Sequence, residues 1–312
     1  MTQSIRKAFP NLGPERAMQS NSEGRSDTVA VLGGGLMAQA VIPHLRDAGF
    51  ALRLYNRTLE RLRQFTGPGV TLCDTPSDSA RGAYVVLSFV SDDEAAAAVW
   101  FGENGALGSM APGAIALECS TLSDQHMRRW IALCRRNQVR PLDVALTGST
   151  PRAAQGTLIA FAGGDSSDLH EAGRLMSTFT EKVVHFGPPG SGMRYKLVHN
   201  FAAAATLTGL AEALTLAEHT GLDMQQVCET LSAFGWAAPV AQSKARAMVD
   251  HGHRSVMCSV NNLAKDVRYA RALAEDDIIL PVAHAMEKQF DEALARGAND
   301  MDMSAIKLAY DA

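Results

Sequence analysis

Lys196, His199 and Asn200 are the residues of this 312-residue chain whose types and spacing could do chemistry. Lys196 and Asn200 are four positions apart, so on a helix they share one face and His199 turns to one side. A lysine amine can give or take a proton, and a carboxamide beside it can orient that amine or a substrate oxygen. A lone lysine is by default a solvated surface group. The rest of the chain favours a buried polar site instead.

The segment that carries these residues, 191–220, is expected to be one long helix. It has no proline, and alanine and leucine dominate after Asn200. Both residues are strong helix formers. Because the segment is longer than the usual globular helix, it should cross between two parts of the molecule.

A glycine-rich turn near the other end of the chain indicates a dinucleotide site. Residues 28–32 are apolar and β-branched, which predicts a buried strand, and a helical pattern follows the turn. In such a turn the first glycine permits the tight bend, the third lets the backbone approach a pyrophosphate, and a small last residue lets helix and strand pack closely. A glycine-rich turn without a ligand is the alternative. The residues of the turn are Gly33, Gly34, Gly35, Leu36, Met37 and Ala38.

The second expected strand, 52–55, bears on the choice of cofactor. Enzymes that use NAD usually place a carboxylate at its end to bind the adenosine ribose. This chain has Asn56, Arg57 and Thr58 there, with Arg61 one helical turn later. A guanidinium can pair with a 2′-phosphate, which favours NADP(H) over NAD(H). The alternative is that both arginines belong to a solvated helix start.

Strand and helix signals alternate up to residue 187, which predicts a doubly wound parallel α/β sheet of the Rossmann type. The further expected strands are 84–90, 114–118, 139–146, 157–162 and 182–186. Ligands of such sheets bind beyond the carboxyl ends of the strands. The residues at those ends are Val90, Ser91, Ser120, Thr121, Thr147, Gly148 and Ser149.

Everything after the break at residues 187–190 is expected to be helical. We therefore expect a dinucleotide-binding domain at 28–190 and an all-α domain at 191–312, joined by the long helix. Residues 1–27 are polar and turn-rich, without the apolar core of a secretory signal, and are interpreted as an extension.

Composition excludes several classes of function. The chain is 46% hydrophobic and 20% charged, with a formal net charge of −4, so a general nucleic-acid binder is not expected. No apolar run is long enough for a membrane span. The five cysteines form no C-x-x-C pair, which is typical of a reducing cytoplasm and predicts neither a disulfide framework nor a metal site.

Several separated blocks resemble the β-hydroxyacid dehydrogenases, the group that includes 3-hydroxyisobutyrate dehydrogenase and tartronate semialdehyde reductase. Residues 33–38 are similar to the family's cofactor loop, 118–121 to its D-x-S-T block, and 143–149 to its D-A-P-V-S-G-G block. Gly190 and Gly192, followed by Lys196 and Asn200, resemble the catalytic block G-x-G-x-x-x-K-x-x-N. Residues 263–266 resemble an element in which a lysine, here Lys265, approaches the cofactor.

The resemblance implies a role for each of these groups. Lys196 would be the general acid/base, and Asn200 would orient it or the substrate oxygen. A substrate carboxylate would be held by Ser120, Thr147, Gly148 and Ser149. The cofactor would lie against the turn at 33–37, the segment 56–58, Val90, Ser91, Thr121 and Lys265.

The substrate loop departs from the family pattern. Ala145, Thr147 and Ser149 stand where the family has proline, serine and a second glycine. An imine reductase on the same fold is therefore an alternative, although such enzymes generally lack the lysine. A non-catalytic NADPH-binding module is a further alternative. The block around Lys196 is also similar to 6-phosphogluconate dehydrogenase, but Ala203 stands near the position of that enzyme's glutamate.

The long helix also raises the question of assembly. Its alanine-rich segments, 202–205 and 211–217, allow close helix packing, and we expect a homodimer through the helical domain. Packing within one chain is the alternative, which composition does not separate from it.

Overall fold

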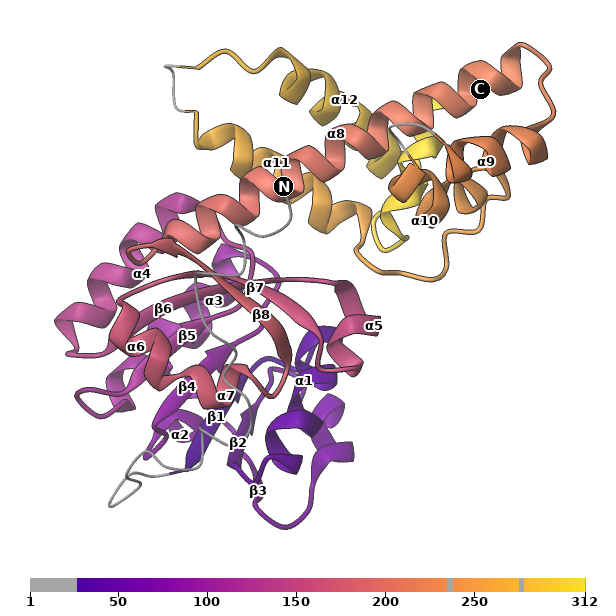
Figure 1. Ribbon diagram of the computed structural model, residues 1–312. Helices are drawn as coiled ribbons and strands as arrows, with labels where there is room; N and C mark the ends of the chain where they lie inside the picture. The colour runs from indigo at the N-terminus through magenta and orange to yellow at the C-terminus, as the bar shows by residue number, and fades with distance from the viewer. Residues whose placement is uncertain (1–26, 235–237, 275–277, 312) are drawn as a thin grey trace, which may run out of the picture.

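The computed structural model describes residues 27–234, 238–274 and 278–311. In that part of the chain, eight strands form one sheet in the order β3-β2-β1-β4-β5-β6-β7-β8 (Figure 1). The expected extension at 1–27 lies outside the described residues except for Asp27. The strands are β1 Thr28–Leu32, β2 Ala51–Tyr55, β3 Val70–Leu72, β4 Val85–Ser88, β5 Ile115–Glu118, β6 Arg140–Thr147, β7 Leu158–Gly163 and β8 Thr180–Gly187.

All neighbouring strands are parallel except β6 and β7, which are antiparallel. The expectation of a parallel sheet is therefore wrong at this one pair. The connection between the two strands, residues 148–157, is shorter than the roughly twelve residues that a parallel crossover requires. The chain turns back instead, and β8 then runs parallel to β7.

Helices cover both faces of the sheet, which confirms the doubly wound α/β fold (Figure 1). Val29 and Val31 of β1 belong to one core, whereas Ala30 and Leu32 belong to the other. This two-sided burial explains why β1 is apolar from Val29 to Leu32. The helices are α1 Leu36–Asp47, α2 Pro76–Ala80, α3 Asp93–Phe101, α4 Asp124–Arg136, α5 Ser149–Ala154, α6 Ser166–Glu171 and α7 Gly173–Met176, with 3-10 turns η3 Leu59–Phe65 and η4 Ala106–Ser109.

The described remainder is helical, as expected. Helix α8 begins against β6, β7 and β8 and then runs out into the other helices, so it does cross between two parts of the molecule (Figure 1). Ala204, Ala211 and Leu214 of α8 lie in the core of this helical region. Its elements are α8 Ser191–His219, α9 Met224–Ala233, α10 Ala238–Val249, α11 Val260–Ala272, α12 Pro281–Ala295 and the 3-10 turn η5 Met303–Tyr310.

None of the helices in the described segments has the length and apolar character needed to cross a membrane.

Candidate active site

The start of α8 is held by Asp143, a fully buried carboxylate on β6. Its Oδ1 accepts a hydrogen bond from the Gly190 amide at 2.5 Å, and its Oδ2 accepts one from the Met193 amide at 2.7 Å. A negative charge is favourable at a helix N-terminus. Burial nevertheless raises the pKa of Asp143 to about 6, because these backbone donors offset only part of the desolvation. Asp143 therefore fixes where α8 leaves the sheet.

Two glycines let α8 approach β7 closely. Gly190 has a φ of +96°, in the left-handed region that favours glycine. A Cβ on Gly192 would lie 2.4 Å from the carbonyl oxygen of Phe161, so a side chain does not fit there. The sequence motif is thus a packing requirement that sets the position of the first turns of α8, where Lys196 lies.

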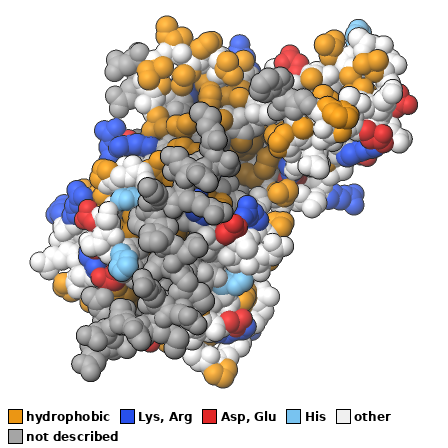
Figure 2. Space-filling view, viewed as in Figure 1, with side chains coloured by type: hydrophobic (Ala, Val, Ile, Leu, Met, Phe, Trp, Pro, Cys, Tyr) orange, Lys and Arg blue, Asp and Glu red, His pale blue; other side chains and the backbone are white. Residues whose placement is uncertain are grey.

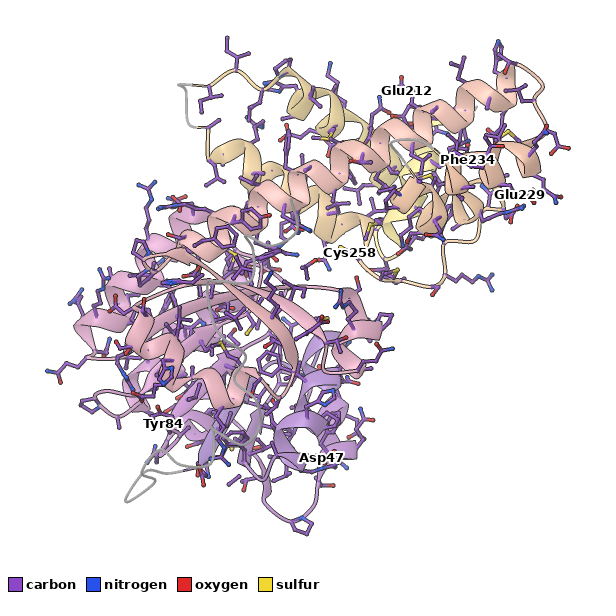
Figure 3. The ribbon with its side chains drawn as sticks, in the orientation of Figure 1. Asp47, Tyr84, Glu212, Glu229, Phe234 and Cys258 are labelled. Carbon is purple, nitrogen blue, oxygen red and sulfur yellow. The ribbon has the colours of Figure 1, made fainter. Side chains whose placement is uncertain are left out.

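Lys196 and Asn200 lie on the buried face of α8, each with 8% of its surface exposed. Within the described residues, Lys196 Nζ makes neither a hydrogen bond nor an ion pair. Burial lowers the pKa of Lys196, and this effect is partly opposed by the negative charge of Asp266. Cys258 also acts electrostatically on Lys196. Figure 3 shows this cysteine on the segment before α11, on the side of the helical region towards the sheet. A buried amine without a partner is suited to proton transfer.

The carboxamide of Asn200 has partners on both sides. Its Nδ2 donates to Oδ2 of the buried Asp266 on α11 at 2.6 Å. Its Oδ1 lies 3.1 Å from Nδ1 of His199. The orientation of the amide is therefore fixed by two neighbours, one on another helix.

Lys265 connects the helical region to the sheet. Its Nζ donates to the carbonyl oxygen of Thr121 at 2.6 Å and lies 3.1 Å from Oδ1 of Asp266. Thr121 is in the loop that follows β5. The predicted cofactor residues Lys265 and Thr121 are thus brought together from distant parts of the chain.

Ser120 lies one residue earlier in the same loop. Its amide donates to Oε1 of Glu118 at 2.7 Å, and its Oγ accepts a hydrogen bond from the Val90 amide at 2.9 Å. Glu118 is fully buried and also accepts from Trp100 Nε1 at 2.6 Å. Burial raises the pKa of Glu118 to about 7. These bonds join the ends of β4 and β5, so Val90 and Ser120 form one local unit.

Thr147, Gly148 and Ser149 form the turn between β6 and α5. Gly148 has a φ of +127°, and Ser149, at +57°, is one of few described non-glycine residues in the left-handed region. Ser149 therefore adopts the conformation that the family's glycine would suit better. Arg152, on α5 just after this turn, donates from Nε to the Thr157 carbonyl oxygen at 2.8 Å and pairs with Glu181 at 2.5 Å. Its guanidinium supports the turn and is not a free cation.

The glycine-rich turn lies between the ends of β1 and β4, where the strand order reverses. Gly33 has a φ of +114°, and a Cβ there would lie 2.1 Å from the Phe89 carbonyl oxygen. A Cβ on Gly35 would meet no atom within 4 Å apart from its chain neighbours, and the N-terminus of α1 has no side-chain cap. The free amides and the open space fit a dinucleotide pyrophosphate.

The neighbouring β2 end is attached to this turn through Asn56. Asn56 Oδ1 accepts from the Gly34 amide at 3.0 Å, and its Nδ2 donates to the Thr58 carbonyl oxygen at 2.7 Å. Arg57 is exposed and has no ion-pair partner in the described part of the chain. Ser91, after β4, donates to Asp92 at 2.7 Å.

Two further residues of this network are included in the sequence analysis without a role being predicted for either. Asp266 and His199 hold Asn200, yet only their neighbours were assigned roles. Their positions could have indicated a role, because Asp266 directly follows Lys265 and His199 directly precedes Asn200.

Comparison with known families covers most of the chain. Residues 28–187 match the model of the NAD-binding domain of 6-phosphogluconate dehydrogenase. Residues 190–310 match the model described as the NAD-binding of NADP-dependent 3-hydroxyisobutyrate dehydrogenase. The chain belongs to the β-hydroxyacid dehydrogenase family. It is an NAD(P)-dependent oxidoreductase that acts on CH–OH groups.

Individual relatives align with nearly the whole chain. An uncharacterized oxidoreductase of Synechocystis sp. is 30% identical over 90% of this chain and 97% of its own. A glyoxylate/succinic semialdehyde reductase of Arabidopsis thaliana is 25% identical over 89% of this chain and 96% of its own. The structure of Mycobacterium tuberculosis 3-hydroxyisobutyrate dehydrogenase with L-serine has a TM-score of 0.80 at 23% identity, covering 92% of this chain and 100% of that one.

Proposed function

We propose that this β-hydroxyacid dehydrogenase uses NADP(H) and interconverts a small 3-hydroxy acid and its semialdehyde. The observation that carries the proposal is Lys196, a buried amine with no hydrogen-bond partner in the described residues, placed beside an oriented carboxamide. The family supports hydroxyacid dehydrogenase chemistry in general terms. The semialdehyde is suggested by the Arabidopsis relative, a glyoxylate/succinic semialdehyde reductase.

Lys196 would act as the general acid/base. In reduction, the protonated amine donates its proton to the carbonyl oxygen, and in oxidation the neutral amine takes the proton back. Because burial lowers the pKa of Lys196, the neutral form becomes accessible closer to neutral pH. Asn200 would donate to, or align, the same substrate oxygen. The nicotinamide, when bound, supplies the hydride in reduction and accepts it in oxidation.

The substrate carboxylate would lie between the ends of β5 and β6. Ser120 offers a hydroxyl, while Thr147 and Ser149 offer hydroxyls and Gly148 an amide in one turn. Hydrogen bonds to a carboxylate are charge-assisted and correspondingly strong. Arg152 pairs with Glu181, so in this proposal the turn and Ser120 supply the donors.

The cofactor would span the carboxyl edge of the sheet. Its pyrophosphate would lie on the amides at the start of α1, and Arg57 would pair with the 2′-phosphate of NADP(H). The remaining contacts would come from the segments that follow β2, β4 and β5, and from α11. The proposed cofactor residues are Gly33, Gly34, Gly35, Leu36, Met37, Asn56, Arg57, Thr58, Val90, Ser91, Thr121 and Lys265.

The reaction is tested by following nicotinamide absorbance with purified protein. We expect NADPH oxidation with short semialdehydes that carry a carboxylate, and NADP⁺ reduction with the matching 3-hydroxy acids. Aldehydes of the same length without a carboxylate are the matched control and should react poorly, because the turn after β6 would have no anion to bind. Turnover of cyclic imines, with silence on both acids and semialdehydes, would contradict the proposal.

We also propose a homodimer formed through residues 191–312, with residues 28–190 binding the cofactor. Helix α8 keeps a face that the described part of its chain leaves exposed, including Thr206, Gly209 and Ala213, although Ala204 and Ala211 belong to the intramolecular core. Beside it, an open and largely apolar groove lies between α8 and α9, lined by Ala213, Ala217, Gln226, Val227, Thr230 and Leu231.

Large hydrophobic side chains are exposed near this groove. Leu216 and Phe234 have 63% and 72% of their surfaces exposed, and Figure 3 shows Phe234 at the end of α9, away from the sheet. Figure 2 shows hydrophobic side chains gathered over the helical region on the face in view. Apolar surface of this kind is typical of an interface.

Light scattering tests the assembly. We expect a mass near twice that of one chain for the wild type, and a shift towards the monomer for Ala213→Arg, which puts a charge in the groove. Glu103→Arg, on an exposed turn near the sheet, is the matched control and should leave the mass unchanged. A wild-type monomer at micromolar concentration would contradict the proposal.

A further inference from the structure

The two hydrogen bonds of Asn200 have directions that are fixed by chemistry. The carboxylate of Asp266 can only accept, so the atom of Asn200 that faces it at 2.6 Å must be Nδ2. The other amide atom is then Oδ1, which can only accept. His199 Nδ1, at 3.1 Å, must therefore carry the hydrogen and donate it.

The chain of contacts continues through Asp266. Its second carboxylate oxygen lies 3.1 Å from Nζ of Lys265, and that amine donates to the Thr121 carbonyl oxygen at 2.6 Å. Donation thus runs from His199 to Asn200 to Asp266, and Lys265 approaches from the opposite side. One network joins α8, α11 and the loop that contains Ser120.

Several titratable groups in and beside this network act electrostatically on Lys196. The titratable groups that face its amine are Asp266 and Lys265 on α11, Cys258 before that helix, and His199 on α8. Asp266 is the one carboxylate among them, and it forms no ion pair with Lys196. It therefore acts on the amine through space, against the desolvation that lowers the pKa of Lys196. Burial also lowers the pKa of His199, which is consistent with a neutral ring that donates from Nδ1.

We propose that Asp266 and His199 are positioning residues that hold the Asn200 amide in one orientation, and that the Asp266 carboxylate, bonded to Asn200 one helical turn from Lys196, acts electrostatically on the Lys196 amine. The kinetic consequence rests on the proposed function of Lys196. Two roles of Asp266, hydrogen-bond acceptor and charge, can be separated by substitution because an asparagine keeps the first and loses the second.

Asp266→Asn is expected to retain a hydrogen bond from Asn200 while removing the negative charge. The Lys196 amine then loses its proton at lower pH, so the alkaline limb of the reduction rate moves to lower pH, with a maximal rate within a few-fold of the wild type. Asp266→Leu removes the acceptor as well, and we expect kcat to fall at least about tenfold at every pH, because a misplaced carboxamide no longer aligns the reacting atoms. Asp291→Asn, which removes an exposed carboxylate on α12, should change neither quantity.

His199 is tested by a donor swap. His199→Gln places a side-chain amide that can donate to Asn200 Oδ1, whereas His199→Leu fills similar space without a donor. We expect kcat to fall about tenfold in His199→Leu and to be largely restored in His199→Gln, with KM for the cofactor unchanged. Equal losses in both variants would mean that His199 packs without orienting Asn200.

A measurement without turnover separates this proposal from the function of Lys196. Protein labelled with ¹³C at the lysine ε carbon is titrated by NMR without cofactor, and the Lys196 signal is assigned with Lys196→Arg. A transition at lower pH in Asp266→Asn supports the charge role of Asp266, even if Lys196 then proves dispensable for turnover, which would overturn the proposed function alone. An unchanged transition would overturn the charge role of Asp266.

Discussion

Lys196→Met should abolish most of the reaction while leaving the cofactor bound. Methionine fills similar space and carries no proton to transfer, so we expect kcat to fall by about 10² to 10⁴-fold, the range typical of a lost general acid/base. Binding of NADPH, measured by its fluorescence on titration, should change little because the proposed cofactor contacts come from other residues. A matched control is Lys182→Met, which removes an exposed lysine on β8 and should leave kcat unchanged.

The direction of the reaction provides a second check on Lys196. Burial lowers the pKa of this amine, so reduction, which needs the protonated form, is lost as pH rises through that pKa. Oxidation needs the neutral form and is lost as pH falls through the same value. Lys196→Arg keeps a cation that does not deprotonate in this range, so oxidation should suffer more than reduction. If Lys196→Met retains turnover within a few-fold of the wild type, Lys196 is not the acid/base.

Local chemistry makes much of this molecule predictable from its sequence. The buried strands β1 and β4 are apolar on both faces, and α8 is rich in helix-forming residues, so both kinds of element can be recognised. Strand β3, Val70–Leu72, is too short to leave a pattern and was not predicted. The antiparallel direction of β7 was not predicted either, although the expected strands 139–146 and 157–162 already leave a connection too short for a parallel crossover.

The candidate site is likewise predictable from the sequence only where local backbone geometry determines it. Gly33, Gly190 and Gly192 are each required by a local backbone geometry that the motif encodes. The bond between Asn200 and Asp266 depends on a contact between α8 and α11, which are far apart in the chain, and no spacing rule predicts it. Asp266 was visible as part of a motif, but its bond to Asn200 is a tertiary contact.

Arg57→Glu should reverse any preference for NADPH. The wild-type guanidinium is exposed and has no ion-pair partner in the described segments, so it is available to the 2′-phosphate at no cost in broken contacts. A charge-assisted hydrogen bond contributes about 1.5 to 3 kcal/mol, which corresponds to roughly 10 to 150-fold in KM for NADPH. A glutamate would repel the phosphate and accept from the ribose hydroxyls, so KM for NADH should fall. Arg61→Glu should have a smaller effect.

The ratio of kcat/KM for NADPH to that for NADH shows whether Arg57 binds the 2′-phosphate, because the ratio cancels changes that affect both cofactors equally. Arg135→Glu, an equal change of charge on the exposed end of α4, controls for long-range electrostatics. If the ratio in Arg57→Glu and Arg61→Glu equals that of the wild type, neither arginine binds the 2′-phosphate. The absence of a carboxylate after β2 would then permit NADP(H) without selecting it, and both cofactors should support turnover at similar rates.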